Sequence, residues 1–349
     1  MVTKIKDPKT DVTLKDIAEV VGKSVAAVSR ALNDHEDIGE ETRQYIKQVA
    51  RDMGYAPNPM AQRLRKQATD TLGLILPVFS PKAFDPYFSE LLSGIAAEAA
   101  QHGYDLLVST CPPGPTELQA YKRLITSRRV DGLLLTRLRW QDERADLLLD
   151  ANIPFVVIDQ SNLPDRVPFV TENSQLGARI AVQHLIEQGR EKIALINAPA
   201  QYIFASAIFA GFQEAMAGAN LPVVEELLTE SAFSQKGGYQ ATQKLLSRAE
   251  PPTAIIAADD IIALGAMAAA QDQGLEIGYD LAVIGYGDIL LAEYSQPPLS
   301  TIHRPTYTLG QHAGQILINH LNHKPIKDPH QVFEPSLVIR QSSDLALWL

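Results

Sequence analysis

The sequence has few of the features that mark secreted or membrane proteins. It contains one cysteine, Cys111, so the chain cannot form an internal disulfide, which is typical of a reducing compartment. No run of about eighteen apolar residues is present, and we expect no membrane-spanning segment. The first residues, MVTKIKDPKTD, have lysines but no apolar stretch, so we expect no secretory signal. These absences predict a protein of the cytoplasm.

The common motifs of catalysis are also missing. There is no GxxxxGK[ST] phosphate loop, no GxGxxG after the first apolar run and no GxSxG elbow. Nothing around Cys111 marks a nucleophile. His312, His320 and His323 could share one face of a helix and bind a metal, but a solvated face is the commoner explanation. We therefore predict no enzymatic activity, no cofactor and no metal.

Length and charge indicate a chain of several parts. With 349 residues, of which 46% are hydrophobic and 21% charged, the protein exceeds one typical domain and has an ordinary globular composition. The net charge is −10, but residues 1–66 hold 12 Lys and Arg against 10 Asp and Glu. The rest holds the other 19 of the 31 basic and the other 31 of the 41 acidic residues. Any contact with nucleic acid is therefore expected at the N-terminal part.

Residues 13–33, TLKDIAEVVGKSVAAVSRALN, have the pattern of two short helices joined by a tight turn. Thr13 and Ser24 are candidate N-caps, and Gly22 permits a sharp turn between the helices. The first helix has an apolar stripe at i, i+3, i+4 and i+7, formed by Leu14, Ile17, Ala18 and Val21. This pattern predicts a helix-turn-helix, although an αα-hairpin within a larger helical domain would have a similar pattern.

The second of these helices has small and cationic residues on its outer face. For a helix in a DNA major groove, we expect base contacts from Val25, Ala26, Ser29 and Arg30. The first two would meet apolar groups such as thymine methyls, and Arg30 would bind a guanine. Phosphate contacts are expected from Thr13, Ser24, Asn33 and Tyr55. Residues 39–54 predict a third helix that closes a small core.

The motifs TLKDIA, VSRALN, ETR, GYAPN and AQRL occur in this order between residues 12 and 66. This segment resembles the DNA-binding head of the lactose-repressor (LacI/GalR) family. The resemblance implies a head over residues 1–57 and a hinge helix with linker over residues 58–68. It also implies a homodimer on a palindromic double-stranded operator, with paired Leu64 side chains wedged into the minor groove. Further DNA contacts in this segment are assigned to Asn58, Gln62 and Arg63.

From Thr71 onward, short apolar runs alternate with helical patterns in two series, the second beginning near Pro168. This order predicts an α/β fold with two doubly wound parallel sheets. The resemblance implies a two-lobed core like that of periplasmic binding proteins, in which the chain crosses between lobes three times. Proline pairs at 164/168, 297/298 and 325/329 agree with such crossings. We thus assign residues 69–163 and 301–327 to an N-subdomain, and 167–297 and 331–349 to a C-subdomain.

Ligands of open α/β sheets bind beyond the carboxyl ends of the strands. Those ends are rich here in carboxylates, arginines and aromatic rings, a mixture suited to sugars. The effector candidates are Asp85, Tyr87, Phe88, Arg137, Trp140, Asp159, Phe233, Asp259 and Asp288. The resemblance supports polar contacts from the last three aspartates and an aromatic contact from Phe233. Residues at the strand ends also have plainer explanations. Asp260 could simply cap the helix that follows it, and Arg137 or Arg139 could be solvated surface residues.

One position departs from the family pattern. Sugar-binding members usually carry arginine where this chain has Ile208, which removes an anchor for hydroxyls or phosphate. Arg137, Arg139 or Arg304 could substitute. We expect a neutral mono- or disaccharide as effector, with a sugar phosphate less favoured.

The functional hypothesis is a nucleoid-associated bacterial repressor of carbohydrate-utilisation genes. It would be a dimer, because the C-terminal segment is too short for an added heptad-repeat helix. The alternatives are a sugar-binding protein of the transport type, which has no use for the head, and a doubly wound enzyme with a fused regulatory head.

Overall fold

The computed structural model describes residues 12–35, 37–55, 68–78 and 86–348. The chain divides into two compact units, Met1–Ala68 and Thr69–Leu349, and each is described by itself. Residues 58–67 of the predicted hinge and linker lie outside the described residues.

The first unit contains three helices, α1 (Leu14–Val21), α2 (Val25–Leu32) and α3 (Glu40–Asp52). Thr13 and Asp16 cap α1 reciprocally, with the Thr13 N–H donating to Asp16 Oδ2 at 2.7 Å. Gly22 follows with a φ of 64°, and the Ser24 hydroxyl accepts from the Ala27 N–H at 3.2 Å to start α2. The three helices enclose a core of Ile17, Ala18, Val28, Ala31, Ile46 and Ala50. The expected helix-turn-helix with its third helix is confirmed.

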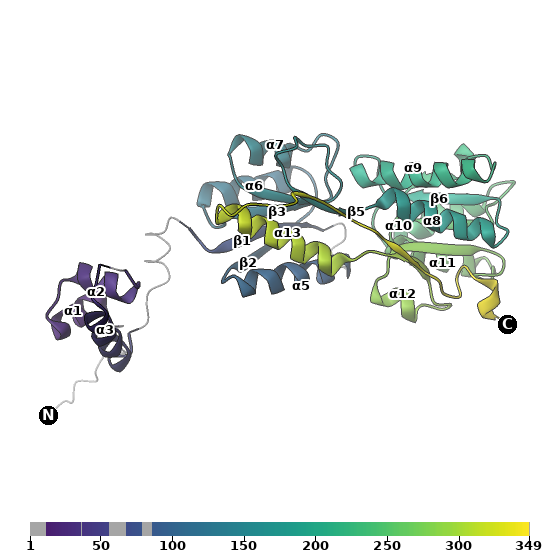
Figure 1. The fold of residues 1–349 in the computed structure, drawn as a ribbon. Helices are drawn as coiled ribbons and strands as arrows, with labels where there is room; N and C mark the ends of the chain where they lie inside the picture. The colour runs from purple at the N-terminus through teal and green to yellow at the C-terminus, as the bar shows by residue number, and fades with distance from the viewer. Residues whose placement is uncertain (1–11, 36, 56–67, 79–85, 349) are drawn as a thin grey trace, which may run out of the picture. The chain divides into compact units, whose positions relative to one another are not determined.

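The second unit contains two six-stranded sheets (Figure 1). The first has the order β11-β5-β4-β3-β1-β2, and its neighbouring strands are parallel. Its strands are β1 (Thr71–Pro77), β2 (Asp105–Cys111), β3 (Gly132–Thr136), β4 (Phe155–Ile158), β5 (Phe169–Glu172) and β11 (His330–Phe333). Its helices are α5 (Pro86–Gln101), α6 (Pro115–Ser127), α7 (Glu143–Asp150) and α13 (Thr306–Leu321).

The second sheet has the order β12-β10-β9-β8-β6-β7, with β12 antiparallel to β10 and the other pairs parallel. Its strands are β6 (Ile193–Asn197), β7 (Leu228–Glu230), β8 (Ala254–Ala257), β9 (Ala282–Gly287), β10 (Ser300–His303) and β12 (Ser336–Val338). The α-helices are α8 (Ser174–Glu187), α9 (Ile203–Gly218), α10 (Gln235–Leu246), α11 (Asp260–Asp272) and α12 (Leu290–Tyr294). Short 3₁₀ turns lie at Glu225–Leu227 and Leu345–Trp348.

The central strands are buried along their whole length because helices cover both faces of each sheet. Every residue of β1, β3, β4 and β8 is buried, which explains why these strands read as continuous apolar runs rather than alternating ones. Each sheet contributes to two hydrophobic clusters, one on each face. The predicted α/β fold of two doubly wound lobes is confirmed.

The predicted subdomain boundaries are wrong at all three crossings. Phe169–Glu172 pairs with β4 and β11 in the first sheet, whereas Ser300–His303 pairs with β9 in the second. Strand β11 belongs to the first sheet and β12 to the second. The chain therefore crosses at Asn173, at Arg304 and Pro305, and at Glu334 and Pro335. Each proline pair lies before its crossing, in a loop after which the chain adds one more strand to the same sheet.

Candidate functional site

The outer face of α2 presents the residues expected to contact DNA bases. Val25, Ala26 and Arg30 are exposed and Ser29 is half-buried, while Val28 and Ala31 point into the head core. Val25 is 44% exposed, so its side chain is accessible to a partner that covers this face of α2. The geometry of α2 therefore agrees with the expected recognition helix.

Several of these side chains already have partners within the head. Arg30 Nη1 lies 2.6 Å from Asp37 Oδ2, and both side chains are about half exposed. Such an exposed ion pair contributes little, so Arg30 can exchange Asp37 for a base at low cost. The Asn33 amide donates to the Ser29 carbonyl at 2.5 Å, and Tyr55 is half-buried against the head core. The expected contacts of Asn58, Gln62, Arg63 and Leu64 lie outside the described residues.

In the core unit, the side chain of Arg137 contacts both lobes. It follows β3 with a φ of 52°, and its side chain is buried. The guanidinium carbon Cζ lies 3.6 Å from the ring centroid of Phe233, which follows β7 of the second lobe. The same carbon lies 5.4 Å from the ring of Phe88 in α5 of the first lobe. Three of the effector candidates thus meet where the carboxyl ends of the two sheets come together.

Asp159 lies beside this junction at the end of β4. Its carboxylate accepts from the Gln160 N–H at 2.7 Å and from the Leu138 N–H at 3.1 Å. Burial raises the pKa of Asp159 to about 7, and the nearby carboxylate of Glu172 adds to the effect. Burial also raises the pKa of Tyr87 to about 12, so this phenol stays protonated. Both groups can therefore donate as well as accept hydrogen bonds near neutral pH.

Sequence reasoning missed Glu172 and Tyr286 at this junction and named Arg304 only as a possible substitute. Arg304 Nη2 donates to Glu172 Oε2 at 3.1 Å, and its Cζ lies 4.5 Å from the ring of Tyr87 and 5.8 Å from that of Tyr286. Glu172 ends β5, a strand that was not predicted. Its position before a crossing was therefore not visible in the sequence.

Buried polar atoms near the junction lack a hydrogen-bond partner among the described residues. They are Thr136 Oγ1 at the end of β3, the Tyr202 hydroxyl after β6 and Arg304 Nε. Tyr202 packs edge-on against Phe233 at 5.6 Å between ring centroids. A buried polar atom without a partner is costly, so a bound polar molecule that supplied the missing bonds would be favoured here.

Other candidates have structural partners instead. Asp259 caps α11 by accepting from the Ile261 N–H at 2.8 Å. Asp288 lies 2.8 Å from Arg340 Nη2 and 3.0 Å from His303 Nδ1. Trp140 is half exposed, and Asp85 lies outside the described residues.

Ile208 is 1% exposed within the core of the second lobe. Its position is thus a packing position in this chain.

Comparison with known proteins agrees with these features. Residues 13–58 match the bacterial regulatory proteins of the lacI family, and residues 182–343 match a periplasmic binding protein-like domain. The chain is 30% identical to the HTH-type transcriptional repressor PurR of Mannheimia succiniciproducens, over 95% of this chain and 98% of that one. This chain belongs to the LacI family. It is also 31% identical to the repressor CytR of Escherichia coli strain K12, over 97% of this chain and 98% of CytR.

Solved structures of LacI-family regulators have the same fold. The lac repressor dimer bound to operator and the anti-inducer ONPF gives a TM-score of 0.80 at 28% identity, covering 96% of this chain and all of that one. A complex of the regulator CelR with cellobiose gives a TM-score of 0.75 at 27% identity, covering 95% of this chain and all of that one. These relatives are transcriptional regulators.

Among the described residues, no cluster of three histidine, cysteine or acidic side chains is arranged to hold a metal ion. No described helix has both the length and the apolar character needed to cross a membrane.

Proposed function

We propose that this LacI-family protein represses carbohydrate-utilisation genes in the bacterial cytoplasm as a homodimer on a palindromic operator. A neutral mono- or disaccharide bound between the two core lobes would control its affinity for the operator. The observation that carries this proposal is the junction at Arg137, where aromatic rings and charged groups from both lobes meet within one buried region.

The chemistry of this junction favours a neutral polar ligand. Two guanidinium groups, Arg137 and Arg304, lie there with the carboxyl groups of Glu172 and of Asp159, which is partly protonated near neutral pH. The net charge of the junction is therefore small, and a ligand with a large charge would be left uncompensated. The rings of Phe88 and Phe233 offer apolar faces of the kind that pack against a sugar ring. Ile208 adds no charge, which further disfavours a sugar phosphate. The cellobiose complex of CelR agrees with this class of ligand.

At the DNA end, α2 would lie in the major groove with Val25, Ala26, Ser29 and Arg30 toward the bases. Twofold symmetry of the dimer would require two half-sites of opposite orientation. Leu64 of each protomer would enter the minor groove between them, where unstacking costs a few kcal/mol and is offset by contacts to the bent duplex. Sugar binding would change the relative position of the lobes and couple to DNA affinity by ~1–3 kcal/mol.

The test combines a ligand screen with an operator. Full-length protein is melted with a panel of neutral mono- and disaccharides and their phosphates. A ligand at about a hundred times its dissociation constant stabilises the folded state by ~2.7 kcal/mol, so a binder raises Tm visibly. The same compound should change affinity for a DNA site selected by the protein from a random pool, and that site should contain two symmetric half-sites.

Arg30→Ala serves as the control variant. It should weaken operator binding while keeping the full sugar-induced rise in Tm, since Arg30 belongs to the head. A panel in which only phosphorylated or non-sugar compounds bind would refute the proposed effector class. A selected site without twofold symmetry would refute the proposed dimeric mode of binding.

A further inference from the structure

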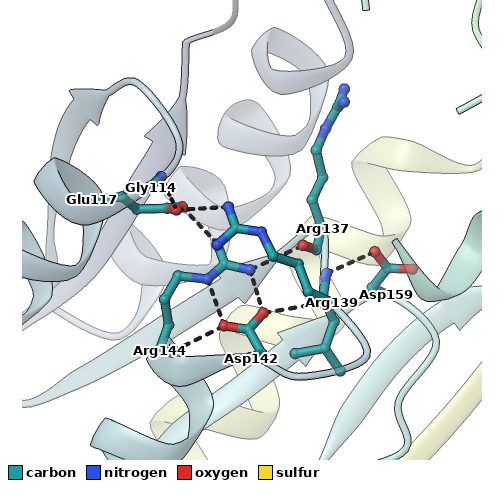
Figure 2. Close-up of polar contacts among 8 residues, drawn as sticks. Gly114, Glu117, Arg137, Arg139, Asp142, Arg144 and Asp159 are labelled. Carbon is teal, nitrogen blue, oxygen red and sulfur yellow. Dashed lines mark hydrogen bonds and ion pairs between the residues drawn. The ribbon is translucent and has the colours of Figure 1, made fainter. Parts of the chain in front are cut away.

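A buried network of charged side chains supports the turn of residues 137–142 (Figure 2). Arg144, in α7, is 1% exposed, and its Nε and Nη2 bind the two carboxylate oxygens of Asp142 at 2.8 and 2.6 Å. Its Nη1 binds Oε1 of the fully buried Glu117, in α6, at 2.8 Å. The other oxygen of Glu117 accepts from Arg139 Nη2 at 2.7 Å. The network therefore holds two cations and two anions in balance.

This network also binds the backbone of the turn. Arg144 Nη2 donates to the Arg137 carbonyl at 2.9 Å, and Asp142 Oδ2 accepts from the Arg139 N–H at 3.0 Å. Arg137 has a φ of 52°, in the left-handed region that costs a non-glycine residue roughly 1–2 kcal/mol. The Arg144 guanidinium binds the Asp142 carboxylate on one side and the Arg137 carbonyl on the other, and so holds the backbone in that conformation.

The other side of the same turn contacts the second lobe. The Leu138 carbonyl accepts from the Ile203 N–H at 3.1 Å, and the Trp140 N–H donates to the Gln201 carbonyl at 3.1 Å. The Arg137 guanidinium lies over Phe233. The turn is thus fixed by charged side chains of the first lobe and joined to the second lobe mainly through its backbone.

We propose that Arg144 is a positioning residue that sets the 137–142 turn for contact with the second lobe, and with it the place of Arg137 at the lobe junction. Three of the four charged side chains are buried, which is a poor way to gain stability because desolvation offsets most of their attraction. A forked guanidinium bound to a carboxylate does fix orientation, which lysine or an apolar side chain cannot reproduce. The contact needs no ligand, but its consequence for effector response rests on the proposed function.

Amide hydrogen exchange on the full-length, ligand-free protein tests this assignment. Two amides, Ile203 and Trp140, donate across the lobe junction and report on the contact directly. In Arg144→Lys the charge is kept but the fork is lost, so both amides should exchange about tenfold faster. Amides of β8, in the centre of the second sheet, should exchange as in the unaltered protein.

Leu317→Ala is the matched control. Leu317, in α13, is fully buried and belongs to the hydrophobic cluster on the other face of the first sheet, which includes no residue of the turn or of the second lobe. Its truncation destabilises the lobe without removing a bond to the turn, so Ile203 and Trp140 should keep their exchange rates relative to the rest of the lobe. If Arg144→Lys does not fold, the isosteric Glu117→Gln should accelerate the same two amides to a smaller extent.

Unchanged exchange of the two amides in Arg144→Lys would overturn the proposal. Equal acceleration in Leu317→Ala would also overturn it, because the two amides would then report only the stability of the first lobe. Neither result depends on a sugar or an operator. Failure of this inference is therefore distinguishable from failure of the proposed function.

Discussion

Asp260, the first residue of α11, is a fully buried carboxyl that binds strand β10 and the loop after β9. One of its oxygens accepts from the Thr301 hydroxyl at 2.5 Å, and the other accepts from the Ile289 N–H at 2.9 Å. A side chain at Gly285 would place its Cβ 2.1 Å from Asp260 Oδ1, which explains why that strand position is glycine. Burial raises the pKa of Asp260 to about 6 from an ordinary value of 3.8.

This raised pKa makes the stability of the core depend on pH. The folded state binds the Asp260 proton more tightly than the unfolded state does. The protonated carboxyl therefore contributes its full stabilisation of the fold below about pH 4, and this contribution is lost as pH rises through about 6. Between pH 5 and pH 8 the loss should be roughly 1 kcal/mol. Asp260→Asn cannot ionise but can accept from Ile289 and donate to Thr301. Urea unfolding at both pH values should therefore show a smaller loss in the variant.

A pH dependence in Asp260→Asn equal to that of the unaltered protein would show that Asp260 keeps an ordinary pKa in the folded state. Asp159→Asn is a less suitable variant, because the carboxylate of Asp159 accepts two backbone N–H groups and an amide would present a donor to one of them.

At the same scale, the sequence could predict which residues follow strands but not which of them meet. Asp159, Asp259 and Asp288 are equivalent by that criterion. Only Asp159 lies beside Arg137 in the structure, whereas Asp259 caps a helix and Asp288 binds Arg340. The difference depends on partners distant in sequence, such as Arg340, which no local pattern near Asp288 reveals.

Among the elements, α5 and α13 come from distant parts of the chain and lie side by side against the first sheet (Figure 1). Their backbones approach closely through glycines. A Cβ at Gly94 would lie 2.1 Å from the Tyr307 carbonyl oxygen, and one at Gly310 would lie 2.4 Å from that of Leu91. Backbone atoms cannot move aside as a flexible side chain can. This pair of helices therefore depends on the absence of side chains at these positions.

Gly94→Ala should destabilise the first lobe by about 2 kcal/mol or more, because overpacking against backbone outweighs the better helix propensity of alanine. Gly218→Ala is the control. Gly218 ends α9, and a Cβ there would meet nothing within 4 Å. This change should be neutral or stabilising by up to ~1 kcal/mol. Thermal unfolding of both variants measures the difference, and similar Tm values would refute the close packing of α5 and α13.

Sequence patterns identified the wholly buried, apolar strands and their helices but missed the strands of mixed polarity at the lobe boundary. Strands β5 (FVTE), β10 (STIH) and β11 (HQVF) have four residues each, with polar and apolar side chains mixed. Such segments have no periodicity to detect, and they become strands because a neighbouring strand offers hydrogen bonds. For the same reason, the positions of the crossings could not be predicted from prolines alone.

For the molecule as a whole, the crossings and the candidate effector site lie together. Glu172 immediately precedes the first crossing, and Arg304 lies in the second. Their ion pair therefore joins two of the three chain segments that connect the lobes. The Glu172 side chain is 3% exposed and the Arg304 side chain is 20% exposed, so salt in the solvent screens this ion pair only weakly. A ligand that contacts Arg304 would thus act directly on two of the segments that connect the lobes.

The division into two units predicts how the whole chain unfolds. The head has a hydrophobic core of its own, formed by residues of α1, α2 and α3, and so small a domain is marginally stable.

Ile46→Ala removes a fully buried side chain from the head core and should lower the stability of the head by ~2–5 kcal/mol. Calorimetry of the DNA-free chain should then show the head transition lowered or lost, with the core transition unchanged. Ile256→Ala, at a buried position in β8, should do the reverse. A single transition that shifts with either variant would mean that head and core unfold as one cooperative unit.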